Sequence, residues 1–470
     1  MKMIQHVLEK FLQVGEKILD MLEGDWDYSS FQLELESSLN ELGKEICREV
    51  MESTDAWLKE NPHERKGWVV ERKNELKNVL TPFGHMSYER TYFRNKKTGH
   101  YAHLVDLAAG LEPHAKTDLT VQAKLLDAAT EISYRKAGKG IWSSGSSECC
   151  FLSGQTVMNT IRRIPLNVKQ DSNNEGKSTV QVLHIQADED HVHKQTGDTA
   201  LAKLVYTTSG YDVNLFSSKY KRLSNVHYIA GLYNDNEVLY QEVYESIDKD
   251  YNIDSLKKIY VSGDGASWIR GLSEYLGAIF LLDKYHINKY IKECLAFCPD
   301  LRRELWKAVK SFDLSATKKV FRDAKKAAKT DSARKQVAKC RKYLVGNWDG
   351  VLAWKKEAQH AIGCSAEGHV SHVLSARLSS RPMAWGEQGI DNMAKLRAMK
   401  ANGISVEEYV LKQATTDLTL AKAVQHAIPV QREKLRKVSG EIFNNMPALR
   451  GSTWSLRKAL RTISTMATGI

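Results

Sequence analysis

The chain has 470 residues, of which 42% are hydrophobic and 27% charged, with only 8 Pro and 29 Gly. This length is enough for about two to four domains and a large core, and this composition excludes long disordered or low-complexity tracts. No apolar run approaches the ~20 residues of a membrane span, and the N-terminal segment reads as an amphipathic helix, not a signal peptide. The seven Cys are scattered and odd in number, which suits a reducing cytoplasm, so we expect a cytoplasmic protein without a membrane partner.

The positive charge is concentrated in one segment of the chain. The formal net charge is +11, and residues 301–350 contain 15 Lys+Arg against 5 Asp+Glu, a net of +10. This concentration predicts a polyanion partner, with a solvated helical face as the alternative. We expect five side chains of this segment to contact nucleic acid: Lys318, Lys319, Arg322, Lys325 and Lys326.

The N-terminal third combines helical and strand patterns. Apolar residues recur at helical spacing and predict three helices, near residues 4–22, 31–57 and 68–80, which would either dimerise or pack on the rest of the chain. Residues 86–93 then alternate and are rich in aromatic residues, a turn follows, and the strand pattern returns at 101–107. This arrangement predicts a β-hairpin.

A candidate helix-turn-helix follows the hairpin. Helical spacing returns at 117–136, a Gly/Ser-rich break covers 138–147, and a short polar helix begins at Ser153, which suits an N-cap. Any small pair of helices has this outline, so DNA reading is one interpretation of it. In that interpretation the second helix supplies three residues that face bases and two that contact phosphates: Gln155, Thr156, Asn159, Arg162 and Arg163.

The second half of the chain predicts a mixed α/β sheet. A polar linker at 171–178 marks a domain boundary. The elements expected beyond it are strands at 180–188, 202–208 and 227–233, a helix at 237–247, a strand at 258–264, a helix at 268–276 and a strand at 278–282. Residues 286–360 are helical and basic, another helix begins near Cys364, residues 378–385 form a loop, and helices continue to the C-terminus.

Two Asp residues at strand ends carry the strongest chemical signal. Asp188 and Asp264 each end a buried strand, and strand pairing that brought them together would create a Mg²⁺ site. Phosphoryl transfer at two metal ions needs about three carboxylates. Glu367 is the third candidate because it lies near a helix start, and Glu387 ranks lower because it lies in a loop. Each residue also has a purely structural interpretation, as a turn Asp or as a Glu favoured by a helix dipole.

Several neighbouring residues have two open interpretations. Asp190 points to the same face of the extended chain as Asp188, and is either an auxiliary metal ligand or part of a solvated strand end. Asp283 and His286 either form a metal-supporting or DNA-positioning pair or cap the next helix. Further expected nucleic-acid contacts follow the third strand and lie in the 378–385 loop: Lys284, His286, Lys289 and Arg381.

Four motifs in this order resemble a known family. They are Gln186–Val192, Gly263–Ile269, Leu282–His286 and Ser379–Met383. Together they resemble the ISLre-type bacterial insertion-sequence transposases, a family long described as uncharacterised. The resemblance extends over most of the chain, and although no single motif is specific, their combination is.

The resemblance implies a fold and a set of catalytic residues. This family is similar to the Mutator-like DDE transposases, which implies an RNase H-like α/β core interrupted by an all-helical insertion between the second Asp and the Glu. The catalytic residues carry over onto Asp188, Asp264 and Glu367, and the 103 residues between the last two contain the basic helices. Where Mutator-like enzymes have Cys-x-x-His, this chain has Asp283-x-x-His286, which leaves the role of that pair open.

This interpretation divides the chain into six regions. They are a helical region suited to dimerisation at 1–80, a hairpin and helix-turn-helix-like region at 81–170, the first part of an RNase H-like core at 175–290, a basic helical insertion at 291–360, the last part of the core at 361–400, and a helical region at 401–470.

The sequence therefore predicts a DDE transposase of a bacterial insertion sequence, associated with the nucleoid, that binds terminal inverted repeats and catalyses Mg²⁺-dependent nicking and strand transfer. Four carboxylates would hold two Mg²⁺ ions, for which Mn²⁺ would substitute: Asp188, Asp264, Glu367 and Asp190. Its partners would be element and target DNA and a second copy of the chain, without a small-molecule cofactor. The alternatives are a Mg²⁺-dependent nuclease that does not join DNA, a non-catalytic DNA-binding protein derived from a transposase, and a structural nucleoid protein.

Overall fold

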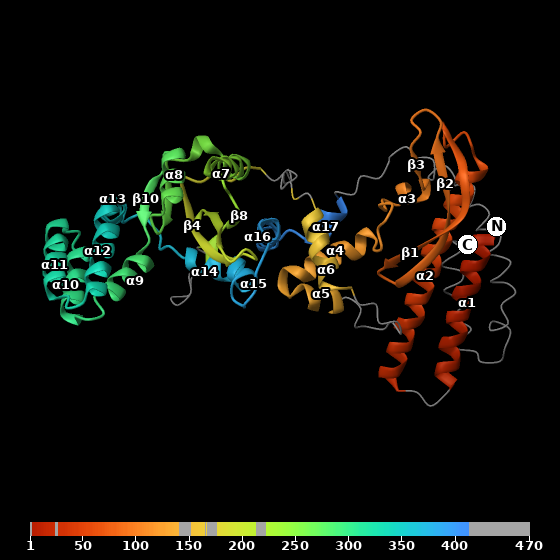
Figure 1. Ribbon diagram of the computed structural model, residues 1–470, viewed down its shortest axis with the longest axis horizontal. Coiled ribbons are helices and arrows are strands. Elements are labelled where there is room, and N and C mark those ends of the chain that lie inside the picture. The colour runs from red at the N-terminus through yellow and green to blue at the C-terminus, as the bar shows by residue number, and fades with distance from the viewer. Residues whose placement is uncertain are drawn as a thin grey trace. The chain divides into compact units, whose positions relative to one another are not determined.

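A computed structural model describes residues 2–23, 27–140, 152–164, 166, 176–212 and 222–412 (Figure 1). The chain forms two compact units, one made of residues 1–160 and 406–470 and the other of residues 161–405. The break expected at 138–147 and the linker expected at 171–178 lie largely outside the described residues, as do the helices expected beyond residue 412.

The first unit begins with two helices that pack together and a small antiparallel sheet. The elements are α1 (Lys2–Glu23), α2 (Tyr28–Glu60), β1 (Trp68–Thr81), β2 (Gly84–Asn95) and β3 (Tyr101–Ala102), with sheet order β1-β2-β3. The carboxylate of Asp27 accepts hydrogen bonds from the backbone of Ser29 and Ser30, which fixes the start of α2. The first two expected helices are confirmed.

The third expected helix, at 68–80, is wrong because this segment is strand β1. Alternate side chains from Glu75 to Val79 point inward, which is the period of a strand, and the whole segment pairs with β2. The hairpin prediction is right about β2, but its main partner is β1. The strand expected at 101–107 is reduced to two residues, and α3 (Leu104–Ala108) follows.

Short helices complete this unit. They are α4 (Leu119–Glu131), α5 (Tyr134–Gly140), α6 (Gly154–Arg163) and α17 (Val406–Lys412). α6 lies at the expected position, and the Ser153 hydroxyl accepts a hydrogen bond from the backbone N–H of Thr156 at 3.1 Å, as an N-cap does. The connection between α5 and α6 lies outside the described residues, so the turn of the candidate helix-turn-helix is not described.

The second unit contains the expected mixed sheet. Its strands are β4 (Val182–His193), β5 (Thr199–Thr208), β8 (His227–Gly231), β9 (Lys258–Gly263) and β10 (Ile279–Leu282), in the order β10-β9-β4-β5-β8. β4, β5 and β8 are antiparallel neighbours, whereas β9 runs parallel to β4 and β10 parallel to β9. The prediction of a mixed α/β sheet is confirmed. A separate pair of two-residue strands, β6 (Gly210–Tyr211) and β7 (Leu223–Ser224), follows β5.

Helices cover and extend this sheet. Between β8 and β9 come α7 (Asn236–Asp250) and the single turn η2 (Ile253–Ser255). After β9 comes α8 (Ser267–Tyr275). The helices that follow β10 are α9 (Lys284–Cys294), α10 (Pro299–Lys310), α11 (Leu314–Ala327), α12 (Asp331–Gly346) and α13 (Trp348–Lys356). The remaining elements are α14 (Ala366–Val370), the π-helical turn η3 (Ser371–Ser375), α15 (Ala376–Leu378) and α16 (Glu387–Ala401).

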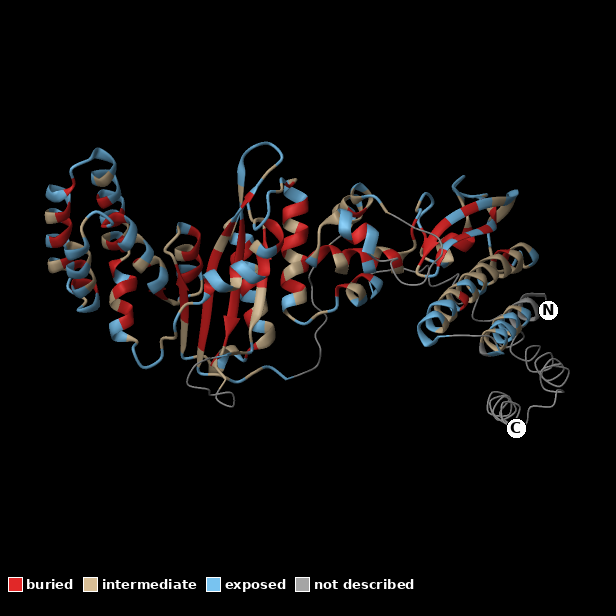
Figure 2. Ribbon diagram, turned by 90° about the horizontal axis from the view of Figure 1, so that it is seen from below, coloured by how far each residue is buried: buried red, intermediate tan, exposed pale blue. Residues whose placement is uncertain are grey.

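One hydrophobic core joins the sheet to the helices that follow β10. It runs from Leu183 of β4 and Val261 of β9 to Val320 of α11 and Leu344 of α12. α13 packs on β10 at one edge of the sheet, and α16 packs on β8 at the other. Figure 2 shows the strands of this sheet as largely buried, while the helices α10, α11 and α12 each keep an exposed side. These helices are therefore packed against the sheet as part of one unit.

Candidate metal centre

Asp188 and Asp264 lie side by side because β4 and β9 are parallel neighbours. Gln186 pairs with Ser262, and two further residues along each strand bring Asp188 next to Asp264. The close approach requires glycine before Asp264, because a Cβ at Gly263 would lie 2.8 Å from the carbonyl oxygen of Ala187. Strand pairing thus brings together the two Asp residues on which the sequence prediction rests.

The expectation that Asp188 ends its strand is wrong. Pairing with β5 carries β4 on to His193, so Asp188 lies in the middle of the strand, opposite Leu204. Only β9 stops at this level. Asp188 is therefore paired with β5 on one side and lies beside the end of β9 on the other. It is 6% exposed, while Asp264 occupies the turn that follows β9.

The Asp264 turn packs against the junction of α12 and α13. The Asp264 carboxylate accepts a hydrogen bond from the backbone of Ala266 at 2.8 Å. Gly265 has a φ of +88°, and a Cβ there would lie 2.8 Å from the amide oxygen of Asn347. Arg270 donates hydrogen bonds to the same oxygen. The helices between β10 and α14 thus support the loop that holds the second carboxylate.

Glu367 lies in the first turn of α14, and hydrogen bonds from β4 hold the residues that precede this helix. The fully buried Gln186 side chain accepts a hydrogen bond from the backbone N–H of Ser365 at 2.7 Å and donates one to the carbonyl of Gly363 at 3.0 Å. The hydroxyl of Tyr206 lies 2.8 Å from that of Ser365. These bonds hold the segment that leads into Glu367 against the strand of Asp188.

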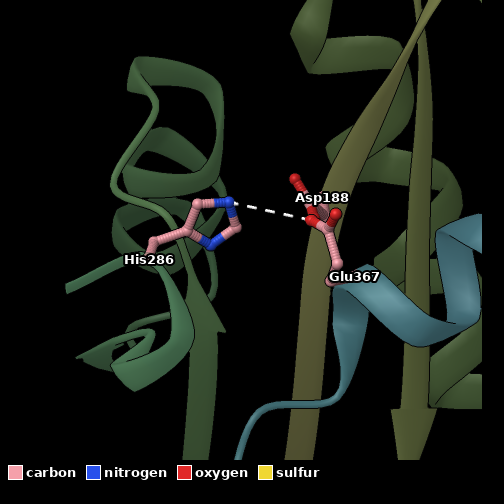
Figure 3. Close-up of side chains that lie close together, drawn as sticks. All are labelled: Asp188, His286 and Glu367. Carbon is pink, nitrogen blue, oxygen red and sulfur yellow. Dashed lines mark ion pairs between the residues drawn. The ribbon is translucent and has the colours of Figure 1, made fainter. Parts of the chain in front are cut away.

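Asp188, Glu367 and His286 form one compact group (Figure 3). Each offers a ligand atom, and these atoms all lie within 4.8 Å of one another, the one such group among the residues that the structure describes. Nε2 of His286 lies 3.8 Å from a carboxylate oxygen of Glu367, whose side chain is 51% exposed. The group is therefore supported from below by the sheet and open on the Glu367 side.

Charge is concentrated in this group. Burial, together with the carboxylates of Asp264 and Glu367, raises the pKa of Asp188 to about 7, while the hydrogen bond from the Glu189 backbone and the nearby His286 act in the opposite direction. Burial alone would lower the pKa of His286, but its hydrogen bond to Asp283 and the nearby Asp188 carboxylate raise it overall. Clustered carboxylates of this kind suit a divalent cation, which relieves their repulsion, so the residues present fit Mg²⁺ or Mn²⁺.

The other expected metal ligands, Asp264 and Asp190, lie outside this group, although the Asp264 carboxylate is near enough to raise the pKa of Asp188. Asp190 is 7% exposed; one carboxylate oxygen accepts a hydrogen bond from the Ser379 hydroxyl at 2.8 Å, and the other has no hydrogen-bond partner among the described residues. Glu387 was expected in a loop, which is wrong, because it is the first residue of α16. Its exposed side chain pairs with Lys194 at 3.1 Å.

Asp283 both caps α9 and pairs with His286. One carboxylate oxygen accepts a hydrogen bond from the backbone of Tyr285 and so caps α9, while the other lies 2.7 Å from Nδ1 of His286. Asp283 is 3% exposed. Its buried carboxylate therefore fixes the orientation of the imidazole that faces Asp188 and Glu367.

The expected nucleic-acid residues are mostly exposed. On α6, the exposed side chains of Gln155 and Asn159 are hydrogen-bonded to each other at 3.1 Å, and Thr156 lies beside the capping Ser153. Arg162 is half-buried, and Nζ of Lys284 lies over the ring of Trp354. Lys284 is exposed, as are the remaining positions: Arg163, Lys289, Lys318, Lys319, Arg322, Lys325, Lys326 and Arg381.

Comparison with known proteins shows the family. The model of an uncharacterised protein family, UPF0236, matches residues 28–414. A UPF0236 protein of Caldanaerobacter subterraneus subsp. tengcongensis is 32% identical over 466 residues, which cover 98% of this chain and 97% of the relative. A UPF0236 protein of Streptococcus gallolyticus, named for the vanSb 3′ region, is 25% identical over 397 residues, covering 80% and 83%. The chain belongs to the UPF0236 family.

A solved structure offers a weaker similarity. The Drosophila P element transposase strand transfer complex matches with a TM-score of 0.23 and 12% sequence identity, covering 77% of this chain and 94% of that one. A TM-score this low carries no argument about fold or function.

Within the described residues, no helix is both long and apolar enough to cross a bilayer.

Proposed function

We propose that this protein is a DDE transposase of the ISLre type, which cuts and joins DNA at the ends of a bacterial insertion sequence. The observation that carries the proposal is that Asp188 and Glu367 lie in one compact group and that Asp264 follows β9, the strand next to that of Asp188, with a basic helical segment between Asp264 and Glu367. Three carboxylates from distant segments at one place are what phosphodiester chemistry at two metal ions requires.

The strand order supports an RNase H-like core. Three antiparallel strands, β4, β5 and β8, are followed by β9 and β10, which run parallel to the first strand on its other side. We infer that this sheet is the RNase H-like core expected from the motifs. The helices α10 to α13 then correspond to the insertion at 291–360 that the family resemblance implies.

The names of the relatives support a mobile element. The name of the first Caldanaerobacter relative joins eleven locus designations. That of a second relative, 33% identical over 464 residues, joins four. We infer that such proteins are encoded repeatedly in one genome, as an element that copies or moves itself would be. A housekeeping nuclease or a nucleoid protein would not need to be encoded at so many loci of one genome.

Each part of the chain has a role in this proposal. Asp188, Asp264 and Glu367 would hold two divalent cations, which neutralise phosphate charge and make the attacking oxygen a better nucleophile when bound. The residues themselves position the phosphodiester between two rigid strands and α14, so that the reaction needs no covalent bond between protein and DNA. The exposed cations of α11 would hold phosphates, and α6 would contact the inverted repeats. Two ends must meet, so we propose at least a dimer.

The test is cleavage of the element ends. Purified protein, Mg²⁺ and labelled DNA carrying the inverted repeats that flank its gene are incubated beside Asp188→Asn, Asp264→Asn and Glu367→Gln variants. We expect metal-dependent nicking at the repeat ends that all three substitutions abolish and that the control Glu387→Gln, which lies outside the group, retains. Cleavage that survives Asp188→Asn would refute the proposed site, and specific binding without any cleavage would identify a non-catalytic protein.

A further inference from the structure

His286 occupies an unusual place for a structural histidine. It lies in the first turn of α9, and its ring is held by the Asp283 carboxylate at 2.7 Å and by an edge-on contact with Tyr285 at 5.3 Å between ring centroids. Asp283 is itself fixed by its bond to the backbone of Tyr285 at 3.0 Å. The imidazole is therefore oriented from behind by a buried carboxylate, and its free edge faces Asp188 and Glu367 (Figure 3).

The hydrogen bond at Nδ1 defines what Nε2 can do. If Nδ1 donates its proton to Asp283, the neutral ring carries its lone pair on Nε2. A carboxylate behind a histidine whose other nitrogen faces carboxylate ligands is the arrangement by which proteins orient metal-bound imidazoles. The 3.8 Å between Nε2 and Glu367 is too long for a hydrogen bond, so the two atoms face each other without bonding.

The separations suit a shared ion. Ligand atoms at about 2.1 Å from one octahedral ion lie roughly 3–4.2 Å from one another. The three ligand atoms of Asp188, His286 and Glu367 lie within 4.8 Å of one another, which is close to that range. An ion pair between a charged His286 and Glu367 would instead favour a direct contact near 2.8 Å.

We propose that His286 is a nitrogen ligand of the metal centre and that Asp283 orients it, so that the centre combines imidazole with carboxylates and binds Mn²⁺ more tightly than Mg²⁺. Sites built from oxygen alone suit Mg²⁺, whereas imidazole favours first-row transition ions. The inference rests on the proposed function only in requiring a metal ion at Asp188 and Glu367. It adds a ligand and a metal preference that three carboxylates do not imply.

Pulsed electron paramagnetic resonance of Mn²⁺ bound to the full chain tests the inference without any DNA. Directly bound imidazole adds ¹⁴N modulation to the Mn²⁺ echo signal. We expect this modulation in the wild type, its loss in His286→Gln, and its retention in His191→Gln, which removes an exposed histidine of β4 that lies 4.0 Å from the carboxylate of Glu189, the residue after Asp188. Bound Mn²⁺ without nitrogen modulation in the wild type, or modulation that survives His286→Gln, would overturn the assignment while leaving the carboxylate site standing.

A second variant separates ligation from folding. Asp283→Asn keeps the shape of the side chain and its bond to Tyr285 but weakens its hold on His286. Loss of such an orienting partner typically lowers metal affinity about 10–100-fold. We expect that loss for Mn²⁺, with a smaller loss for Mg²⁺, in protein whose circular dichroism spectrum matches the wild type. Equal losses for both ions would contradict the stated preference, and a wild type that binds neither ion would refute both this inference and the proposed function.

Discussion

The side chain of Gln186 binds the backbone of Ser365, accepting its N–H at 2.7 Å, although the two residues are 179 positions apart. Gln186 lies two residues before Asp188, and Ser365 lies two residues before Glu367. One buried amide thus joins the strand that carries the first carboxylate to the segment that carries the third. The distance between the two carboxylates is set by this bond and by the start of α14.

Replacing Gln186 by Leu should loosen Glu367 without removing any metal ligand. The N–H of Ser365 and the carbonyl of Gly363 would each lose their hydrogen bond to this side chain, and one such bond contributes about 0.5–1.5 kcal/mol to stability. We expect a lower Tm and weaker Mn²⁺ binding in calorimetric titration. Gln241→Leu, an exposed position on α7, is the control and should change neither. Unchanged Mn²⁺ affinity in the Gln186 variant would show that this bond does not position Glu367.

The stability of the metal-free protein should depend on Asp188 and on pH. Burial raises the pKa of Asp188 to about 7 from 3.8, so the folded state holds this proton more tightly than the unfolded state. The protonated carboxyl therefore contributes its full stabilisation below about pH 4, and this stabilisation is lost as the pH rises through about 7. The Asp188→Asn variant has a neutral side chain at every pH and so should not lose stability in this way. In EDTA we expect the variant to exceed the wild type at pH 8 by about 1–3 kcal/mol and to match it near pH 4.

Thermal melts of the two proteins across this pH range provide the measurement. Added Mn²⁺ should raise the Tm of the wild type at pH 8 and leave that of Asp188→Asn nearly unchanged, because the ion replaces the proton as the partner of the carboxylate. A stability difference that stays constant from pH 4 to pH 8 would show that Asp188 is not the buried, proton-retaining group described above.

Gly265→Ala should impair the second carboxylate through its neighbour Asn347. Alanine at a φ of +88° is strained by about 1–2 kcal/mol, and its Cβ would also lie 2.8 Å from the Asn347 amide oxygen. Gly197→Ala is a matched control, because φ there is +90° and no atom lies within 4 Å of the added Cβ. We expect both variants to lose similar stability but only Gly265→Ala to lose cleavage activity. Equal activity in the two would remove any role for the packing of this turn.

The lysines of α11 should determine how DNA binding responds to salt. Lys318, Lys319, Lys325 and Lys326 are exposed, and each phosphate contact contributes about −0.9 to the slope of log K against log salt concentration. We expect replacement of all four by Ala to weaken binding of any DNA sequence and to reduce this slope, whereas replacement by Arg preserves both. Fluorescence anisotropy between 50 and 200 mM salt, about the range over which such contacts are lost, measures it. An unchanged slope would show that the lysines of α11 do not contact phosphates.

Local patterns predicted the central sheet and failed where pairing is non-local. β5, β8, β9 and β10 lie close to their expected positions because each is a short apolar run bounded by turn residues. Residues 68–80 were expected as a helix and form β1, because pairing with β2 outweighs their helical spacing. The chain was expected to stay extended as far as Asp190, but nothing in the run up to Asp188 indicates that β5 would pair with β4 as far as His193.

The carboxylates were predictable from sequence, but the hydrogen bonds that position them were not. Asp188 and Asp264 follow apolar runs, and parallel pairing makes them neighbours. Gln186 is a polar residue inside an apolar run, which signals a buried hydrogen-bond partner. The identity of that partner, Ser365, depends on where the chain returns after five helices. The distance from His286 to Glu367 depends on that same return.

Joining of DNA tests the central claim most directly. A labelled duplex that ends in the recessed 3′-hydroxyl of the inverted repeat is incubated with the protein, Mn²⁺ and a supercoiled plasmid, and the products are separated under denaturing conditions. If the protein is a DDE transposase, we expect the wild type to attach the label covalently to plasmid strands and the Asp188→Asn variant never to do so. Plasmid that is nicked by the wild type in a metal-dependent way but never acquires the label would contradict transposition and leave a nuclease.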